Sequence, residues 1–340
     1  MIKEMIAKLV EGNHLAEDEA ETVMREIMAG QATPAQIAAY VTALRMKGET
    51  VDEITGSARA MREKATRIQA NDPRVVDTCG TGGDKMHTFN ISTTAAFVVA
   101  GAGITVAKHG GRSVSSSCGS ADVLKSLEVK IDLLPEKVEE CLNEIGIGFL
   151  FAPNFHLAMR HAVGPRQEIG VRTIFNMLGP LTNPANASIQ VLGVYNAELT
   201  DIMAQVLLKL GSQHCFIVHG SDGLDEITIT GKTKICEGKE GRIQCYYVQP
   251  KDFSLEGGRV KDIEGGDAQR NAQITLSVLR GERGPRRDIV LLNAAPAMVA
   301  CGKARTLQEG VKLAQEVIDS GAAYEKLEAL KAVTNRATNK

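Results

Sequence analysis

The chain has 340 residues, 44% of them hydrophobic and 24% charged, a composition typical of a folded protein with a large core. Its net charge is −2 and it has no lysine- or arginine-rich run, so the composition gives no sign of a nucleic-acid surface. No apolar run is long enough to cross a membrane, and the first residues lack the layout of a signal peptide, so we expect a cytoplasmic protein. The seven cysteines are scattered and form no CxxC pair, which favours reduced thiols over a disulfide scaffold or a zinc site.

Residues 1–69 are expected to form a small helical lobe. Apolar side chains recur at helical spacing in four segments of this region, which are joined by short loops. Two segments begin with capping boxes, Thr33-Pro34-Ala35-Gln36 and Thr50-Val51-Asp52-Glu53, which are typical of helix starts. The helical pattern breaks at Asn71-Asp72-Pro73, so we assign the lobe to residues 1–69.

Residues 72–340 are expected to form an α/β domain around a central, mostly parallel sheet, because strand-like runs alternate with helical ones. Strands are predicted at 75–79, 104–108, 148–152, 189–195, 215–219, 226–230, 242–248 and 289–293. Helices are predicted near 92–101, 119–128, 135–145, 198–210, 267–280 and 305–319. The 226–248 region is predicted to be an antiparallel excursion. The proline-rich residues 153–187 are predicted to be irregular, and to return to the helical lobe or form a site.

A glycine-rich loop follows the first predicted strand. The β-branched run ends at Gly80-Thr81-Gly82-Gly83-Asp84, and Asn90-Ile91-Ser92-Thr93-Thr94 opens an apolar helix about ten residues later. A strand, a glycine loop and a helix start present free backbone N–H groups to a phosphate. The loop lacks both the Gly-Lys-Ser/Thr of ATP-type loops and the GxGxxG of dinucleotide folds, so we expect a different phosphorylated ligand.

A second candidate loop for an anion runs from Lys108 to Asp122. It combines two cations, a serine run and three glycines, so that hydroxyl and amide groups can donate to an anion while Lys108 and Arg112 neutralise its charge. A flexible serine-glycine linker is the alternative. The position of Lys108-His109 at the end of a predicted buried strand favours the anion site.

Asp225-Glu226 is a candidate magnesium-binding pair. Two adjacent carboxylates near the end of an apolar strand suit a hard divalent cation, although such a pair alone is more often a solvated turn. In open α/β sheets, ligands bind at the carboxyl ends of the strands. We therefore expect this turn and the two anion loops to meet at one edge of the sheet.

Arg166 and Arg172 lie in a stretch punctuated by proline and glycine. Either arginine could bind a carboxylate through both nitrogens, and a structural role is an equal alternative. The histidines at 109, 156, 161 and 219 show no spacing that indicates a triad or a metal pair, so packing is their expected role.

Together, these segments resemble the anthranilate phosphoribosyltransferases, which have the nucleoside-phosphorylase-like phosphoribosyltransferase fold. The resemblance covers nearly the whole chain. It rests most on Gly80-Thr81-Gly82-Gly83-Asp84, Asn90-Ile91-Ser92-Thr93, Lys108-His109-Gly110, Ser115-Ser116, Gly119-Ser120-Ala121-Asp122-Val123-Leu124, Arg172-Thr173-Ile174-Phe175-Asn176, Leu178-Gly179-Pro180-Leu181-Thr182-Asn183-Pro184 and Asp225-Glu226.

The resemblance implies transfer of phosphoribose from phosphoribosyl pyrophosphate (PRPP) to the amine of anthranilate. It implies that Ser92, Asp225 and Glu226 bind two Mg²⁺ ions, that Gly80 and Arg166 contact anthranilate, and that the helical lobe forms a homodimer interface. Lys108 and the metal would stabilise the leaving group, and no catalytic acid or base is assigned. The implied PRPP-binding residues are Gly80, Gly83, Asp84, Thr88, Asn90, Ile91, Ser92, Thr93, Lys108, His109, Gly110, Arg112, Ser113, Val114, Ser115, Ser116 and Ser120.

Gly111 departs from the pattern of this family, which normally has asparagine at this position. In the family that asparagine contributes to the anthranilate site. A missing neutral hydrogen bond typically costs about 0.5–1.5 kcal/mol, so the departure predicts weaker acceptor binding, by roughly two- to tenfold, and not a loss of catalysis.

Two alternative functions remain open. One is a related transferase or phosphorylase with a different aromatic or base acceptor. The Asp225-Glu226 pair and the glycine loop argue against this alternative, because they favour a Mg-pyrophosphate donor. The other is a non-catalytic paralogue that binds nucleic acid. Such a protein is expected to lose the donor loop and show a basic groove, whereas this chain keeps the loop and is slightly acidic.

Overall fold

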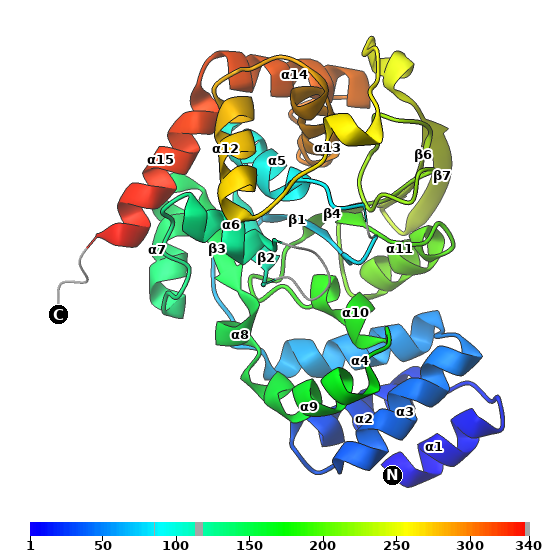
Figure 1. Cartoon of the computed structure of the whole chain (residues 1–340). Helices are drawn as coiled ribbons and strands as arrows, with labels where there is room; N and C mark the ends of the chain where they lie inside the picture. Colours follow the sequence, from blue (N-terminus) through cyan, green and yellow to red (C-terminus); the bar gives the residue numbers. More distant parts are fainter. Residues whose placement is uncertain (85, 113–117, 337–340) are drawn as a thin grey trace.

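Four helices form an N-terminal lobe in the computed structural model, which describes residues 1–84, 86–112 and 118–336 (Figure 1). The two predicted capping boxes are present, with Thr33 accepting from the Gln36 N–H and Thr50 from the Glu53 N–H. Apolar side chains of all four helices pack into one core. The helices are α1 (Ile2–Val10), α2 (Glu17–Met28), α3 (Pro34–Lys47) and α4 (Val51–Lys64).

A seven-stranded sheet forms the centre of the larger domain, in the order β3-β2-β1-β4-β5-β6-β7. The first five strands along the chain pair in parallel, and β6 and β7 add an antiparallel hairpin at one edge. The hairpin lies in the region predicted as an antiparallel excursion, although no strand was predicted at the position of β6. Because the chain order reverses between β1 and β4, their carboxyl ends mark the switch point at which ligands bind in such sheets. The strands are β1 (Val76–Gly80), β2 (Val106–Gly110), β3 (Ile147–Phe151), β4 (Ile189–Gly193), β5 (His214–Gly220), β6 (Thr233–Lys239) and β7 (Arg242–Val248).

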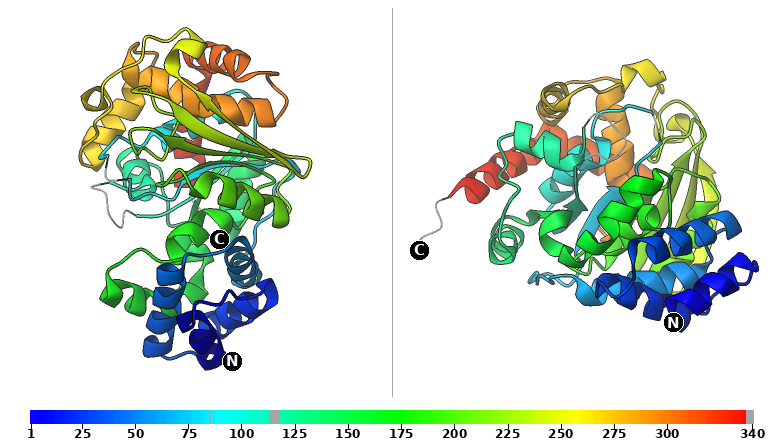
Figure 2. Two further views of the ribbon diagram at one scale, coloured as in Figure 1. Left: turned by 90° about the vertical axis from the view of Figure 1, so that its right-hand side faces the viewer. Right: turned by 60° about the horizontal axis from the view of Figure 1, so that its bottom comes forward.

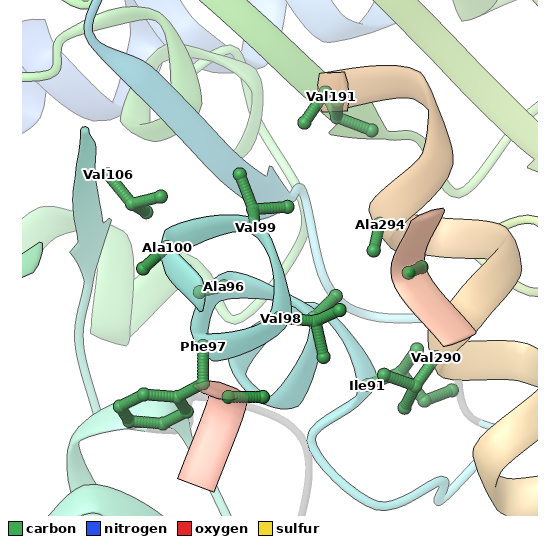
Figure 3. Close-up of a cluster of buried hydrophobic side chains, with 14 of the residues drawn as sticks. Ile91, Ala96, Phe97, Val98, Val99, Ala100, Val106, Val191, Val290 and Ala294 are labelled. Carbon is green, nitrogen blue, oxygen red and sulfur yellow. The ribbon is translucent and has the colours of Figure 1, made fainter. Parts of the chain in front are cut away.

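The helix after β1 is buried on all sides. Figure 3 shows Val99 of this helix on the side of the sheet, represented by Val106 and Val191, and Val98 on the side of a second helix, represented by Val290. These apolar contacts hold the amino terminus of the buried helix against the end of β1. The helices of the domain are α5 (Ile91–Gly101), α6 (Ser120–Ser126), α7 (Pro135–Ile145), α11 (Leu199–Lys209), α12 (Ala268–Leu279), α13 (Pro285–Ala300), α14 (Leu307–Asp319) and α15 (Ala322–Asn335). The short helices η3 (Pro250–Phe253) and η4 (Val260–Asp262) precede α12.

Residues 153–187 are more regular than predicted. They contain most of α8 (Ala152–Phe155), then η1 (Leu157–Met159), α9 (Arg160–Ile169), α10 (Phe175–Leu178) and η2 (Gly179–Leu181). Helix α9 packs against α2 and α3, so this segment returns to the N-terminal helices (Figure 1). Figure 2 shows these helices at one end of the molecule, with the amino terminus far from the sheet.

Two strand predictions are wrong. Residues 289–293 lie inside α13, because Pro285 starts a helix there and the apolar run is buried on one side of the sheet. Residues 226–230 form no strand, because the Thr228 and Thr230 hydroxyl groups donate to the Asp222 carboxylate and hold a compact loop.

The expectation that all the cysteines are reduced is also wrong. Cys236 and Cys245 lie directly opposite each other on β6 and β7 and form a disulfide, while Cys79, Cys141, Cys215 and Cys301 remain thiols. No helix among the described residues is long and apolar enough to span a membrane.

Candidate active site

Two hydrogen bonds join the glycine loop after β1 to the acidic turn after β5. The Gly82 N–H donates to Oδ2 of Asp225 across 2.8 Å, and the Ser92 N–H, in the first turn of α5, donates to Oε1 of Glu226 across 3.1 Å. Helix N-termini favour negative charge, so the first turn of α5 stabilises the Glu226 carboxylate at this position. The glycine loop and the acidic turn therefore meet at the switch point of the sheet.

Glycines at two strand ends make room for the acidic turn. A Cβ on Gly80 would lie 2.5 Å from Oδ2 of Asp225, and a Cβ on Gly193 would lie 1.5 Å from the Asp225 carbonyl oxygen. Real Cβ atoms do not approach oxygen so closely. The sequence did not predict that Gly193, at the end of β4, belongs to the site. A glycine that ends an apolar strand was the only feature that pointed to it.

The carboxylates of the acidic turn repel each other. Burial first, and then the charge of Asp84, raises the pKa of Asp225 to about 7. Burial and the neighbouring Asp225 raise the pKa of Glu226 well above its usual value, and Lys108 opposes this rise. Half-buried oxygen ligands with unbalanced negative charge fit a hard divalent cation such as Mg²⁺. The Ser92 hydroxyl, close to Lys108, adds a neutral oxygen to this set.

Lys108 is a buried cation beneath these loops. It lies on β2, its Nζ donates to the Thr78 carbonyl across 2.5 Å, and it also reaches the Ser92 hydroxyl at 3.4 Å. Burial lowers the pKa of Lys108, and the nearby charge of Asp77 opposes this effect. Asp77 is held in turn by the His109 N–H and the Asn183 side chain. The cation is therefore anchored under the glycine loop and the start of α5.

Three other residues predicted to bind PRPP, Asn90, Ser120 and Thr88, contact neighbouring segments, whereas Ile91 and Thr93 are buried in the domain. Asn90 bridges two segments, because its Nδ2 donates to the Cys118 carbonyl and its Oδ1 accepts from Asn271. The Ser120 hydroxyl donates to the Gly111 carbonyl, and Thr88 pairs with Glu264 in an isolated bridge. Ser113, Val114, Ser115 and Ser116 lie outside the described residues.

Arg166 lies on α9, which packs on the N-terminal helices. Its guanidinium carbon is 5.1 Å from the centroid of the Phe175 ring, and burial lowers its pKa. Within the described residues its side chain forms no hydrogen bond or ion pair. Its N–H groups can therefore bind a carboxylate of a ligand.

Known proteins match this chain over nearly its whole length. Residues 3–65 match the helical bundle domain, and residues 72–324 the a/b domain, of a glycosyl transferase family. The anthranilate phosphoribosyltransferase of Moorella thermoacetica is 59% identical over 330 residues, which cover 97% of each chain. That of Desulfosudis oleivorans is 57% identical, over 97% of this chain and 98% of that protein.

This chain belongs to the anthranilate phosphoribosyltransferase family. Solved structures support the assignment in three dimensions. The Thermus thermophilus enzyme superposes with a TM-score of 0.93 at 43% identity, covering 98% of this chain and 99% of that one. The Saccharomyces cerevisiae enzyme, in complex with PRPP and Mg, has a TM-score of 0.89 at 28% identity, covering 98% and 97%. The family resemblance and the fold class predicted from the sequence are thus confirmed.

Two histidines of this family member meet, although their spacing in the sequence gave no sign of it. His109 and His156 are buried, and their Nε2 atoms lie 3.2 Å apart. Burial is the main cause that lowers the pKa of His109 to about 3 and that of His156 to about 4. Both rings are therefore neutral near pH 7, and one can donate to the other.

Proposed function

We propose that this member of the anthranilate phosphoribosyltransferase family transfers phosphoribose from PRPP to the amine of anthranilate and releases diphosphate. The observation that carries the proposal is the junction of Gly82 with Asp225 and of Ser92 with Glu226, above the buried Lys108. This junction combines backbone donors, a fixed cation and a pair of cation-binding carboxylates. Such a set suits a metal-bound diphosphate rather than a single phosphate.

Breaking the bond between C1 of the ribose and the diphosphate builds negative charge on the leaving group. Lys108 and the N–H groups at the start of α5 are held in place before the reaction, so they can stabilise this charge without reorganising. We propose that Ser92, Asp225 and Glu226 hold two Mg²⁺ ions, which when bound neutralise the diphosphate. The other residues that we propose bind PRPP position the ribose and its phosphate.

The acceptor needs little activation by the protein. The amine of anthranilate is already a usable nucleophile, so orientation contributes more than a strong base. We propose that Arg166 binds the anthranilate carboxylate and that Gly80 lies beside the ring. The guanidinium of Arg166 forms no hydrogen bond or ion pair with the described residues, which supports this role. We further propose that the lobe, residues 1–69 joined by part of 153–187, carries this acceptor arginine, and the packing of α9 on α2 and α3 supports that division.

We also propose a homodimer formed through the helical lobe. Val10 on α1 and Met46 on α3 are 73% and 84% exposed, which leaves apolar surface on this lobe for a partner copy. Sedimentation of the wild-type protein tests the proposal, and a monomer at every concentration would contradict it.

Anthranilate fluorescence tests the proposed reaction. Purified protein with PRPP and Mg²⁺ should consume anthranilate and release one diphosphate per turnover, and a chelator should stop both signals until Mg²⁺ is restored. A panel of other aromatic amines and pyrimidine bases should be used more slowly. Faster diphosphate release with another acceptor would favour the alternative left open by Gly111.

A further inference from the structure

Arg172 lies between an aromatic ring and the glycine loop, in a position that no proposed role explains. Its guanidinium carbon is 4.4 Å from the centroid of the Tyr195 ring. On the other side, a Cβ added to Gly83 would lie 2.6 Å from Nη2, 3.0 Å from Cζ and 3.1 Å from Nε. The guanidinium therefore lies against the Gly83 backbone, in space that any larger residue would fill.

The Arg172 side chain forms no hydrogen bond or ion pair with the part of the chain that the structure describes. Among residues 1–84, 86–112 and 118–336, no carboxylate lies within 4.0 Å of it and it forms no hydrogen bond. An arginine over a tyrosine ring is attracted by the ring electrons, typically by about 0.5–2 kcal/mol. Tyr195 is thus the contact that holds the guanidinium over the loop.

The loop needs such support. Gly82 and Gly83 have φ of +63° and +78°, a conformation that glycine adopts easily and also leaves easily. The loop is also tied to the segment that carries Tyr195, because the Thr81 N–H donates to the Gly193 carbonyl and the Tyr195 N–H donates to the Thr81 hydroxyl. One side of the loop is therefore held by hydrogen bonds and the other by the stacked Arg172.

We propose that Arg172, stacked on Tyr195, is a positioning residue that holds the Gly82-Gly83 turn in the shape that binds the diphosphate of the donor. In this shape the Gly82 N–H faces Asp225. The inference rests on the proposed function for the identity of the donor. Loss of the stack leaves the loop free to adopt other conformations, so the donor binds more weakly while the acceptor site is unchanged.

Substitutions that separate the charge from the stack test this inference. Arg172→Lys keeps the positive charge but loses the planar group, and Tyr195→Leu keeps apolar bulk but loses the ring. Each should raise the KM for PRPP by about three- to tenfold and leave the KM for anthranilate within twofold. Tyr195→Phe, which keeps the ring, should restore the PRPP KM relative to Tyr195→Leu.

The double variant is the decisive measurement. Because Arg172 and Tyr195 act as one unit, Arg172→Lys combined with Tyr195→Leu should raise the PRPP KM no more than either change alone. Arg280→Lys is the matched control, since Arg280 stacks on Tyr324, 5.0 Å from its centroid, far along the chain from the loop. If the effects of the two single changes on the PRPP KM multiply in the double variant, Arg172 and Tyr195 act independently and the proposal is wrong. A rise confined to the KM for anthranilate would also contradict it.

Calorimetric titration with Mg-diphosphate supplies a readout that needs no turnover. Arg172→Lys and Tyr195→Leu should weaken diphosphate binding by the same three- to tenfold factor, with unchanged circular dichroism as the check on folding. Wild-type protein that binds diphosphate but does not consume anthranilate would reject the proposed function and leave this inference intact. Undiminished diphosphate binding by both folded variants would reject the inference alone.

Discussion

The Gly82 N–H donates to Oδ2 of Asp225 across 2.8 Å, between residues that are 143 positions apart in the chain. This contact exists because Gly80 and Gly193, at the ends of β1 and β4, have no side chain to keep the acidic turn away. The switch point of the sheet, two glycines and one carboxylate thus create the candidate donor site together. The following predictions test its parts one at a time.

Asp225→Asn should nearly abolish activity. The amide keeps an oxygen that can accept from Gly82 but removes the negative charge that a divalent cation requires. We expect kcat/KM to fall by on the order of 100-fold or more, and the dependence on Mg²⁺ to weaken. Asp222→Asn on the same turn is the control. Its carboxylate binds the Thr228 hydroxyl and lies in a structural loop, so this change should lower stability and leave the Mg²⁺ dependence intact.

Lys108→Met should slow the reaction more than it weakens binding of the donor. The buried ammonium group contacts Ser92 and opposes the charge of Glu226, so it acts on charge that develops as the diphosphate leaves. Removing one such preorganised group typically costs on the order of 10²–10³ in kcat. Lys125→Met, at an exposed position of α6, is the matched control. A fall in kcat of less than tenfold would show that Lys108 does not stabilise the leaving group.

Arg166→Ala should harm the use of anthranilate. Loss of a charge-assisted contact to a carboxylate costs about 1.5–3 kcal/mol, which corresponds to roughly 10- to 150-fold in the KM for anthranilate. The KM for PRPP should stay within about twofold. Arg160→Ala, at an exposed position on the same helix, controls for the loss of an arginine from α9. An effect on PRPP alone would place Arg166 in the donor site.

The sequence predicted the parallel strands well, because each is a short β-branched or apolar run that stops at glycine or at polar residues. It failed at residues 289–293, since the four apolar residues in a row at 289–292 fit a buried strand and a buried helix equally. Pro285, a good first residue of a helix, was the signal that could have decided between them. The short runs of 153–187 hid α9, because Pro165 lies inside that helix.

Contacts between distant segments were harder to predict than the loops themselves. The sequence left the roles of Arg166 and Arg172 equally open, since spacing within one segment does not say which surface each faces. Only the fold shows that Arg172 reaches Gly83 and Tyr195. The pairing of Cys236 with Cys245 depends on a two-residue turn at Glu240-Gly241, both with positive φ, which fixes the register of the hairpin.

Gly111→Asn should improve acceptor binding. A Cβ at Gly111 meets no atom of the described residues within 4 Å and the backbone is not in the left-handed region, so these residues accept asparagine without strain. One added neutral hydrogen bond should lower the KM for anthranilate by roughly two- to tenfold and leave the KM for PRPP nearly unchanged. Gly111→Ala fills the same space without a hydrogen-bonding group and should not have this effect. An equal or higher KM for anthranilate in the asparagine variant would contradict our interpretation of the departure.

The buried pair His109 and His156 should make the protein less stable as the pH falls from 7 to 5. Their folded pKa values, about 3 and about 4, lie below the value near 6.5 of an unfolded histidine, so the unfolded state binds more protons in this range. One such histidine lowers the free energy of unfolding by on the order of 2 kcal/mol between pH 7 and pH 5. Carboxylates with raised pKa values, such as Asp77, act in the opposite direction but are common to the wild type and a histidine variant. The difference in free energy of unfolding between the wild type and His156→Asn should therefore shrink by about this amount from pH 7 to pH 5. Urea unfolding at both pH values, with the exposed His14→Asn as control, measures it, and a constant difference would show that His156 is not buried as a neutral ring.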